Sequence, residues 1–211
     1  MQNVVVLGKG VLAIKVANWF LNHSKYQLKA IVPVIPEPTW TSSISKWAKK
    51  NNVLLIESGK FQDVPPEISI DLAISVTYDK IIKIEFIQRC KKILNIHNSP
   101  LPKYRGVSPI NWALKNNETT HGVTIHEITP RIDDGPIWGQ VIFSIYPKRD
   151  EVIDVYKRCL HFGWTLFKET IPLLDDIKPY QQNEAKATYY NLSQNNQLGD
   201  RRYFTKKSSL K

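Results

Sequence analysis

Three polar residues, Asn95, His97 and Asp133, have the types and the spacing that acyl transfer to an amine requires. Asn95 and His97 are two residues apart at the end of an apolar run, so a strand turns both side chains to one face. Asp133 lies further along, before Gly135 and Pro136, where the sequence predicts a second strand-to-turn junction. An amide can donate to a developing oxyanion, an imidazole can take the amine proton, and a carboxylate can hold the imidazole tautomer.

The elements that must position these side chains alternate between β-branched apolar runs and segments of helical periodicity. The predicted strands lie at residues 3–7, 28–34, 53–57, 71–76, 93–97, 122–128 and 136–146, and the predicted helices at 11–21, 42–50, 108–116 and 152–174. This alternation predicts an α/β fold, a Rossmann-like, doubly wound and mostly parallel sheet with helices on both faces. Sites in such sheets form at the carboxyl ends of strands, which is where His97 is expected.

Turn and cap signals refine this picture. Gly8-Lys9-Gly10 predicts a tight turn that closes the first strand onto a helix. It matches the dinucleotide-binding fingerprint only in part, because Ala13 replaces the last glycine and no acid follows at the ribose position. Lys9 is then expected near a helix N-terminus, where it can meet an anion. Ser108 is the predicted N-cap of its helix, with Pro109 at the first helical position.

The composition suits one globular domain with a C-terminal tail in a chain of 211 residues. No apolar run is long enough for a membrane span, and the N-terminus has the pattern of a first strand and not of a signal peptide. Cys90 and Cys159 are isolated, which indicates a reduced, cytoplasmic protein without a metal site. The formal charge of +10 favours anionic ligands, although the basic-aromatic interleaving of a nucleic-acid surface is missing.

The segment from Asn95 to Gln140 resembles the folate-dependent formyltransferase family. The likeness is carried by Asn95-Ile96-His97, by residues 99–106, by the run at 121–126, and by Asp133-x-Gly135-Pro136-Ile137; a weaker likeness continues upstream through residues 75–82. The resemblance implies that Asn95, His97 and Asp133 are the catalytic residues. It also implies that 10-formyltetrahydrofolate is the formyl donor.

By the same resemblance, two loops hold the pterin ring of the donor, largely through backbone groups. The expected cofactor-binding residues are Tyr78, Lys80, Ile81, Ile82, Thr129, Arg131 and Ile132. Ile81 and Ile82 are equally suited to core packing. The positive charge suits a pyrophosphate, and the expected substrate contacts are Lys9, Tyr78, Lys80, Ser99 and Arg105, of which the basic side chains are equally suited to a solvated surface.

The family includes members with three kinds of amine acceptor. Members that formylate glycinamide ribonucleotide resemble one another in a Gly-Ser-Asn phosphate cradle, whereas this chain has Lys9-Gly10-Val11-Leu12 there. Methionyl-tRNA formyltransferases carry a further C-terminal domain, for which too few residues follow the predicted core. Residues 108–113 most resemble the sugar-nucleotide members. We therefore expect a dTDP-linked 4-amino-4,6-dideoxyhexose acceptor, destined for surface polysaccharide such as the O-antigen of lipopolysaccharide, with the other two acceptors as alternatives.

Two non-enzymatic functions are alternatives to catalysis. A folate- or nucleotide-binding module would show a broken triad, and this triad is intact. A basic RNA-binding protein would bind polynucleotide with a strong dependence on salt. We expect neither nucleic-acid nor membrane binding.

The predicted catalytic domain spans residues 1–178, followed by a C-terminal extension at 179–211. The extension is polar but contains Tyr180, Tyr189, Tyr190, Tyr203 and Phe204. Disordered tails are usually poor in aromatic residues, so we expect this segment to be ordered. It should pack on the core or on the partner subunit of a homodimer.

Overall fold

The computed structural model describes the backbone of residues 1–202 and the side chains of residues 1–199. Tyr203 and Phe204, to which the sequence assigned a packing role, lie outside the described residues. The contacts within the chain define two compact units. The first comprises Met1–Ile96 and Glu127–Arg131, and the second comprises His97–His126 and the chain from Ile132 onward.

The first unit is an open parallel sheet with helices. Its elements are β1 (Gln2–Gly8), α1 (Gly10–Leu21), β2 (Tyr26–Pro33), α2 (Ile44–Lys50), β3 (Leu54–Leu55), a 3-10 turn (Phe61–Asp63), β4 (Ile70–Val76), α3 (Ile84–Ile87) and β5 (Cys90–His97). The strand order is β3-β2-β1-β4-β5, and every one of these pairs is parallel. The predicted α/β class with a mostly parallel sheet is therefore confirmed.

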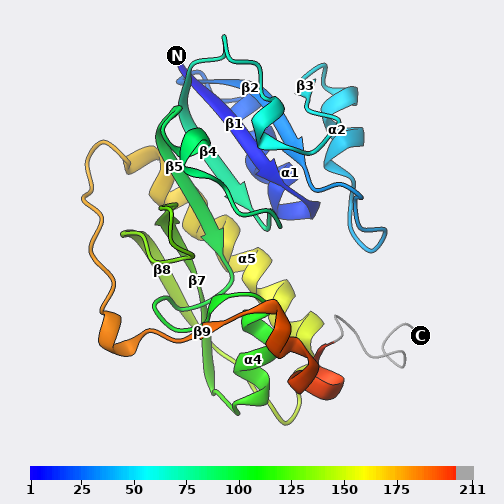
Figure 1. Ribbon diagram of the computed structural model, residues 1–211, viewed down its shortest axis with the longest axis vertical. Helices are drawn as coiled ribbons and strands as arrows, with labels where there is room; N and C mark the ends of the chain where they lie inside the picture. The colour runs from blue at the N-terminus through cyan, green and yellow to red at the C-terminus, as the bar shows by residue number, and fades with distance from the viewer. Residues whose placement is uncertain (203–211) are drawn as a thin grey trace. The chain divides into compact units, whose positions relative to one another are not determined.

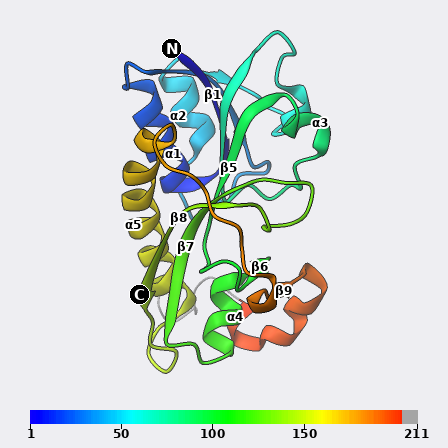
Figure 2. The ribbon, with the colours of Figure 1, turned by 90° about the vertical axis from the view of Figure 1, so that its left-hand side faces the viewer.

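Helices on both faces explain why the inner strands are uniformly apolar. All four residues of the run Val4–Leu7 in β1 are fully buried. Val5 and Leu7 belong to a core cluster with Phe61 and with Phe86 of α3. Figure 2 shows α1 and α2 on one side of these strands and α3 on the other. A strand covered on both faces loses the alternation of polar and apolar residues, as β1 does.

The predicted turn at Gly8-Lys9-Gly10 is present, and close packing against β4 requires its first glycine. A Cβ on Gly8, which has a φ of 145°, would lie 2.0 Å from the carbonyl oxygen of Val76. The backbone N–H of Lys9 donates to the same carbonyl oxygen at 3.3 Å. Lys9 thereby becomes the N-cap of α1.

The second unit combines an antiparallel strand pair, two helices and a small parallel sheet (Figure 1). Its elements are β6 (Arg105–Gly106), α4 (Pro109–Lys115), β7 (Thr120–Glu127), β8 (Ile137–Ser144), α5 (Val152–Thr170), β9 (Tyr189–Tyr190) and 3-10 segments at Ile171–Leu173, Glu184–Lys186 and Leu192–Arg202. β7 pairs with β8 in antiparallel fashion, and β6 pairs with β9 in parallel.

Two helix termini differ from the sequence-based expectation. The helix expected to reach residue 174 ends as α-helix at Thr170 and continues as a 3-10 turn, in which Pro172 lacks the N–H that an α-helix needs. Ser108 does stand at the N-cap position of α4, but with a φ of 55° and without a capping bond from its side chain. Its Oγ instead accepts a 3.0 Å hydrogen bond from Nδ2 of Asn195.

The described part of the C-terminal extension packs within the second unit through aromatic stacking. The ring of Tyr190 in β9 stacks on Trp112 of α4, with ring centroids 4.3 Å apart, and on Tyr104 at 5.7 Å. Nδ2 of Asn116 donates to the hydroxyl groups of both Tyr104 and Tyr190. Such pairs add roughly 0.5–1.5 kcal/mol each to the burial of the rings. Tyr190 of the extension thus packs on Tyr104 and on α4, and β9 pairs with β6.

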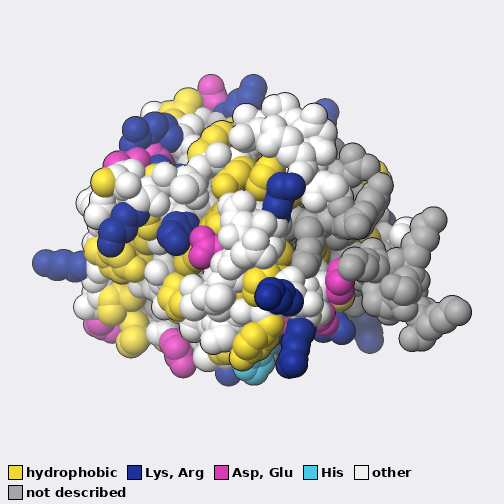
Figure 3. Space-filling view, turned by 90° about the horizontal axis from the view of Figure 1, so that it is seen from below, with side chains coloured by type: hydrophobic (Ala, Val, Ile, Leu, Met, Phe, Trp, Pro, Cys, Tyr) yellow, Lys and Arg dark blue, Asp and Glu magenta, His cyan; other side chains and the backbone are white. Residues whose placement is uncertain are grey.

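Two surface properties concern the predicted partners. Across residues 1–202, no helix is both long and apolar enough to cross a bilayer. On the face shown in Figure 3, Lys and Arg side chains stand singly among acidic and apolar ones and do not gather into one field.

Candidate active site

β5 carries Asn95 and His97 to its carboxyl end. The register of the sheet pairs Asn95 with Ser75 of β4. Asn95 is half-buried, and His97, the last residue of the strand, is 8% exposed. The two-residue spacing turns both side chains to one face of the strand. The strand predicted at 93–97 is therefore present and begins earlier, at Cys90.

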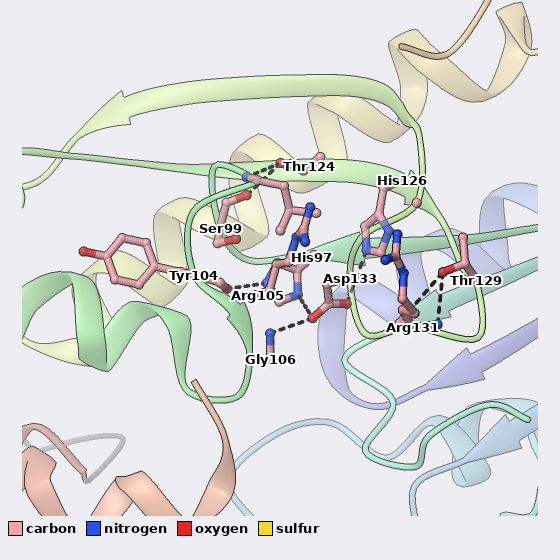
Figure 4. A network of polar contacts seen from close by, with 12 residues as sticks. His97, Ser99, Tyr104, Arg105, Gly106, Thr124, His126, Thr129, Arg131 and Asp133 are labelled. Atoms are coloured by element: carbon pink, nitrogen blue, oxygen red, sulfur yellow. Dashed lines mark hydrogen bonds and ion pairs between the residues drawn. The ribbon is translucent and has the colours of Figure 1, made fainter. Parts of the chain in front are cut away.

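The imidazole of His97 faces an oxygen acceptor at each ring nitrogen (Figure 4). Nε2 lies 3.0 Å from the backbone carbonyl oxygen of Tyr104, and Nδ1 lies 3.7 Å from Oδ2 of Asp133. Tyr104 belongs to the loop after β5 and has a left-handed φ of 62°. Carbonyl and carboxylate oxygens only accept hydrogen bonds, so a neutral imidazole can donate to one of these two partners and an imidazolium can donate to both.

Asp133 lies between a backbone donor and a second imidazole. Its Oδ2 accepts a 2.8 Å hydrogen bond from the backbone N–H of Gly106, and its Oδ1 lies 3.5 Å from Nε2 of His126. Asp133 has a φ of 51°, in the left-handed region that Asp and Asn tolerate better than most residues. The carboxylate is thus in ion-pair range of His97 and His126 together.

The surroundings of Asp133 favour its charged form. Burial alone raises the pKa of this carboxyl group, because it removes water from the charge. The charge of His97, the hydrogen bond and charge of His126, and the N–H of Gly106 together outweigh burial and hold the pKa of Asp133 well below its usual 3.8. Asp133 is therefore a carboxylate at physiological pH, able to orient an imidazole and to balance its positive charge.

His126 was missed as a functional residue, because a lone His at an alternating strand position usually belongs to the core. It is 1% exposed and lies near the end of β7. Two residues earlier in β7, Oγ1 of Thr124 donates to the carbonyl oxygen of Ser99 at 2.7 Å and accepts from the N–H of Leu101 at 3.2 Å. β7 thus contacts both the loop that follows His97 and Asp133 itself. The available sequence signal was the position of His126 just before the turn that bears Asp133.

Ser99 and Arg105 have internal partners, which argues against their predicted contacts with a sugar nucleotide. Ser99 is fully buried, and its Oγ donates to the carbonyl oxygen of Lys103 at 2.8 Å. Arg105 is 8% exposed, and its guanidinium donates to Oε1 of Gln182 from Nε and Nη2. Nη1 and Nη2 of Arg105 also donate to the two carboxylate oxygens of Glu184. These bonds use the donors that a pyrophosphate would need.

Tyr78 and Lys80, in the first unit, meet at one backbone carbonyl. The hydroxyl of Tyr78 and Nζ of Lys80 donate to the oxygen of Gly59 at 2.7 Å and 2.6 Å. Burial raises the pKa of Tyr78 to about 12, so the phenol keeps its proton. The two neighbouring isoleucines differ: Ile82 packs in the core and can offer a ligand only its backbone, whereas Ile81 is 70% exposed.

The second predicted folate loop is a tight turn. Oγ1 of Thr129 accepts from the N–H of Arg131 at 3.2 Å and donates to its carbonyl oxygen at 3.1 Å. Arg131 is exposed, and Ile132 is 38% exposed. The contact of these positions with a folate stays a prediction.

The remaining ligand predictions concern Lys9 and metals. Lys9 is half-buried at the N-terminus of α1, so its contact with an anion also stays a prediction. Within the described residues, no cluster of three or more His, Cys, Asp or Glu side chains could hold a metal ion.

Comparison with known proteins identifies relatives over most of the chain. The family model described as "Formyl transferase" matches residues 46–171. The bifunctional polymyxin resistance protein ArnA of Wigglesworthia glossinidia brevipalpis is 34% identical over 145 residues, which cover 65% of this chain and 22% of the relative. A methionyl-tRNA formyltransferase of Caldicellulosiruptor saccharolyticus is 27% identical over 201 residues, covering 89% of this chain and 64% of the relative. The chain thus spans less than two thirds of the length of both proteins.

The fold is also found in solved structures. The crystal structure of an N-formyltransferase from Helicobacter canadensis, in complex with folinic acid and dTDP-3-aminofucose, superposes with a TM-score of 0.80. The two sequences are 29% identical, and the match covers 92% of this chain and 72% of that chain.

Proposed function

The chain belongs to the formyl transferase family, and we propose that it transfers a formyl group from 10-formyltetrahydrofolate to the amino group of a dTDP-linked amino-deoxysugar. One observation carries this proposal: the carboxylate of Asp133 lies between His97 and His126, and the strand that ends at His97 also carries Asn95. The similarity to the Helicobacter canadensis enzyme, whose structure holds a folate and a dTDP-amino sugar, supports both the donor and the class of acceptor.

The predicted folate-binding residues suit a flat, partly apolar ring. Ile81 and Ile132 each expose an apolar side chain, and each lies in a loop whose backbone groups can recognise a pterin. When bound, the donor supplies an activated formyl carbon. The residues of this chain bind and orient the donor, stabilise the charge that develops in the reaction and transfer the proton.

Asn95 is proposed to donate its amide N–H to the formyl oxygen as negative charge develops there. Removing one such donor from other acyl-transfer sites costs roughly 3–4 kcal/mol. His97 is proposed to take the proton that the attacking amine must lose, a role worth about 10²–10⁴-fold in rate, and to return it to the folate nitrogen that leaves when its bond to the formyl carbon breaks. The imidazolium formed in this way already has two acceptors beside it, the carboxylate of Asp133 and the carbonyl oxygen of Tyr104.

The ring position of the amine separates closely related acceptors. The expected acceptor is a 4-amino sugar, whereas the compound bound to the Helicobacter canadensis enzyme carries a 3-amino group. Initiator tRNA is a second candidate acceptor, because 201 residues align with a methionyl-tRNA formyltransferase. Glycinamide ribonucleotide is the third, and Lys9-Gly10-Val11-Leu12 disfavours it.

An acceptor screen with 10-formyltetrahydrofolate tests the proposal, with release of tetrahydrofolate as the signal. The panel contains dTDP- and UDP-linked 3-amino- and 4-amino-dideoxyhexoses, glycinamide ribonucleotide and charged initiator tRNA. We expect turnover with a dTDP-amino sugar and its loss in His97→Asn. Turnover only with tRNA or glycinamide ribonucleotide, or equal turnover in His97→Asn, would overturn the proposal.

The cellular setting proposed for the enzyme follows from this acceptor. We propose that it acts in the cytoplasm as a homodimer and supplies a formylated sugar for O-antigen or another surface polysaccharide. Sedimentation of the purified chain tests the dimer. Loss of the formyl group from the surface polysaccharide in a deletion strain tests the pathway.

A further inference from the structure

Gln182 joins the C-terminal extension to the turn that bears Asp133. Its side chain is buried, with 8% of the residue exposed. Nε2 of Gln182 donates 2.8 Å hydrogen bonds to the backbone carbonyl oxygens of Asp133 and Gly135. Oε1 of the same amide accepts from Nε and Nη2 of Arg105, at 3.1 Å and 2.8 Å.

The partners of Gln182 permit only one orientation of its amide. Backbone carbonyl oxygens only accept hydrogen bonds, and a guanidinium only donates them. The amide nitrogen must therefore face Asp133 and Gly135, and the amide oxygen must face Arg105. All four hydrogen bonds would be lost if the amide were turned over, so the assignment does not depend on resolving nitrogen from oxygen.

These bonds complete the support of Asp133 from β6. Gly106 of β6 holds the carboxylate directly through its backbone N–H. The adjacent Arg105 holds Gln182, which in turn fixes the main-chain carbonyl of Asp133. A residue with a φ of 51° keeps this conformation only where its surroundings impose it. Gln182 anchors the main chain on both sides of Asp134.

We propose that Gln182 is a positioning residue for the reaction: by anchoring the turn at 133–135, it keeps the carboxylate of Asp133 within reach of Nδ1 of His97. The effect of Gln182 on the reaction rests on the proposed function. Its anchoring of the turn at 133–135 rests on the hydrogen bonds alone. The titratable groups that face the carboxylate are His97 from β5 and His126 from β7. Arg105 acts on it only through Gln182.

Gln182→Glu isolates the anchoring bonds. The new carboxylate keeps the shape of the side chain and still accepts from Arg105, but it presents an oxygen to the carbonyl groups of Asp133 and Gly135. Glu184→Gln is the matched control, because Glu184 contacts the same guanidinium as Gln182 does. If Gln182→Glu does not fold, Gln182→Met removes the anchor with a side chain of similar volume, and the same measurements apply.

Two measurements separate positioning from general loosening. The first is kcat and KM for the dTDP-amino sugar. We expect kcat to fall about 10- to 100-fold in Gln182→Glu, because small misplacements of a catalytic group cost rates of this order, with KM within twofold. The second is the imidazole ¹⁵N resonances of His97 at neutral pH, which report on the contact of Nδ1 with Asp133 and require no substrate. We expect them to move in Gln182→Glu and to stay at their wild-type positions in Glu184→Gln.

Unchanged His97 resonances in Gln182→Glu would overturn the inference. Equal changes in both variants would do the same, since they would indicate a loosened extension and not a specific anchor. A wild-type chain inactive on every acceptor would refute the proposed function, and the His97 resonances would still decide the role of Gln182.

Discussion

The backbone N–H of Gly106 donates a 2.8 Å hydrogen bond to Oδ2 of Asp133, across 27 residues of sequence. This bond joins the loop after β5 to the turn before β8. The position of the carboxylate that faces His97 therefore depends on β6. This strand has two residues and is paired with the C-terminal extension.

Gly106→Ala should damage both β6 and the site. Gly106 has a φ of 90°, and a Cβ there would lie 2.1 Å from the carbonyl oxygen of Tyr190. We expect a loss of about 1–3 kcal/mol in the free energy of unfolding and a fall in kcat of tenfold or more. Urea unfolding and steady-state kinetics measure both. Gly199→Ala is the control, because Gly199 also has a positive φ but no atom within 4 Å of the added Cβ. Equal behaviour of the two variants would contradict the prediction.

His126→Gln should reduce kcat, although a buried histidine at an alternating strand position usually belongs to the core. The substitution removes an imidazole partner of Asp133 and leaves His97 in place. We expect kcat to fall about tenfold, a smaller loss than that of His97→Asn, with little change in KM. His161→Gln serves as the control, because His161 is an exposed residue of α5. A kcat equal to that of the wild type would mean that His126 only packs.

His121 should make stability depend on pH in a defined window. Burial lowers the pKa of His121 to about 4, although its hydrogen bond with the carbonyl oxygen of Asn98 acts in the opposite direction. Between pH 6.5 and about 4 the unfolded chain binds a proton at this position that the folded chain does not, so stability falls as the pH falls. The contribution is up to about 3 kcal/mol.

Replacing the ring with one that cannot titrate tests this linkage. We expect the unfolding free energy of His121→Phe to fall less steeply than that of the wild type between pH 6.5 and 4. Phe can retain the edge contacts with Tyr104 and Phe143 that His121 makes. Urea titrations at several pH values measure the difference. If the unfolding free energies of the two proteins fell equally with pH, His121 would not be the source of the pH dependence.

Substitution of Arg105 should lower stability without changing dTDP affinity, whereas substitution of Lys9 should lower dTDP affinity without changing stability. Arg105→Lys cannot reproduce the forked contacts with Gln182 and Glu184, so we expect lower thermal stability and wild-type affinity for dTDP. Lys9→Ala should leave stability nearly unchanged and weaken dTDP binding several-fold, as expected for a half-buried cation at a helix N-terminus. Calorimetric unfolding and dTDP titration compare the two. Loss of dTDP affinity in Arg105→Lys alone would restore Arg105 as a phosphate ligand.

The sequence by itself determined the order of the longer strands and helices, the parallel α/β class and the placement of Asn95 and His97 on one strand face, whereas the short elements α3, β6 and β9 were not predicted. These features depend on local geometry: strand alternation has a period of two and helices a period of 3.6, and both are visible in neighbouring residues. The turn at Gly8-Lys9-Gly10 was predictable for the same reason. Pro172 also carried a local signal, which the helical periodicity of the surrounding residues masked.

Only the tertiary structure decided which polar side chains reach Asp133 and which are used up elsewhere. His126, Gly106 and Gln182 come from separate segments, and Gln182 contacts Asp133 from 49 residues away. No local pattern encodes such a distance. Ser99 and Arg105 had the chemistry of substrate ligands, but burial gave them internal partners, because a polar group removed from water must satisfy its hydrogen bonds within the protein.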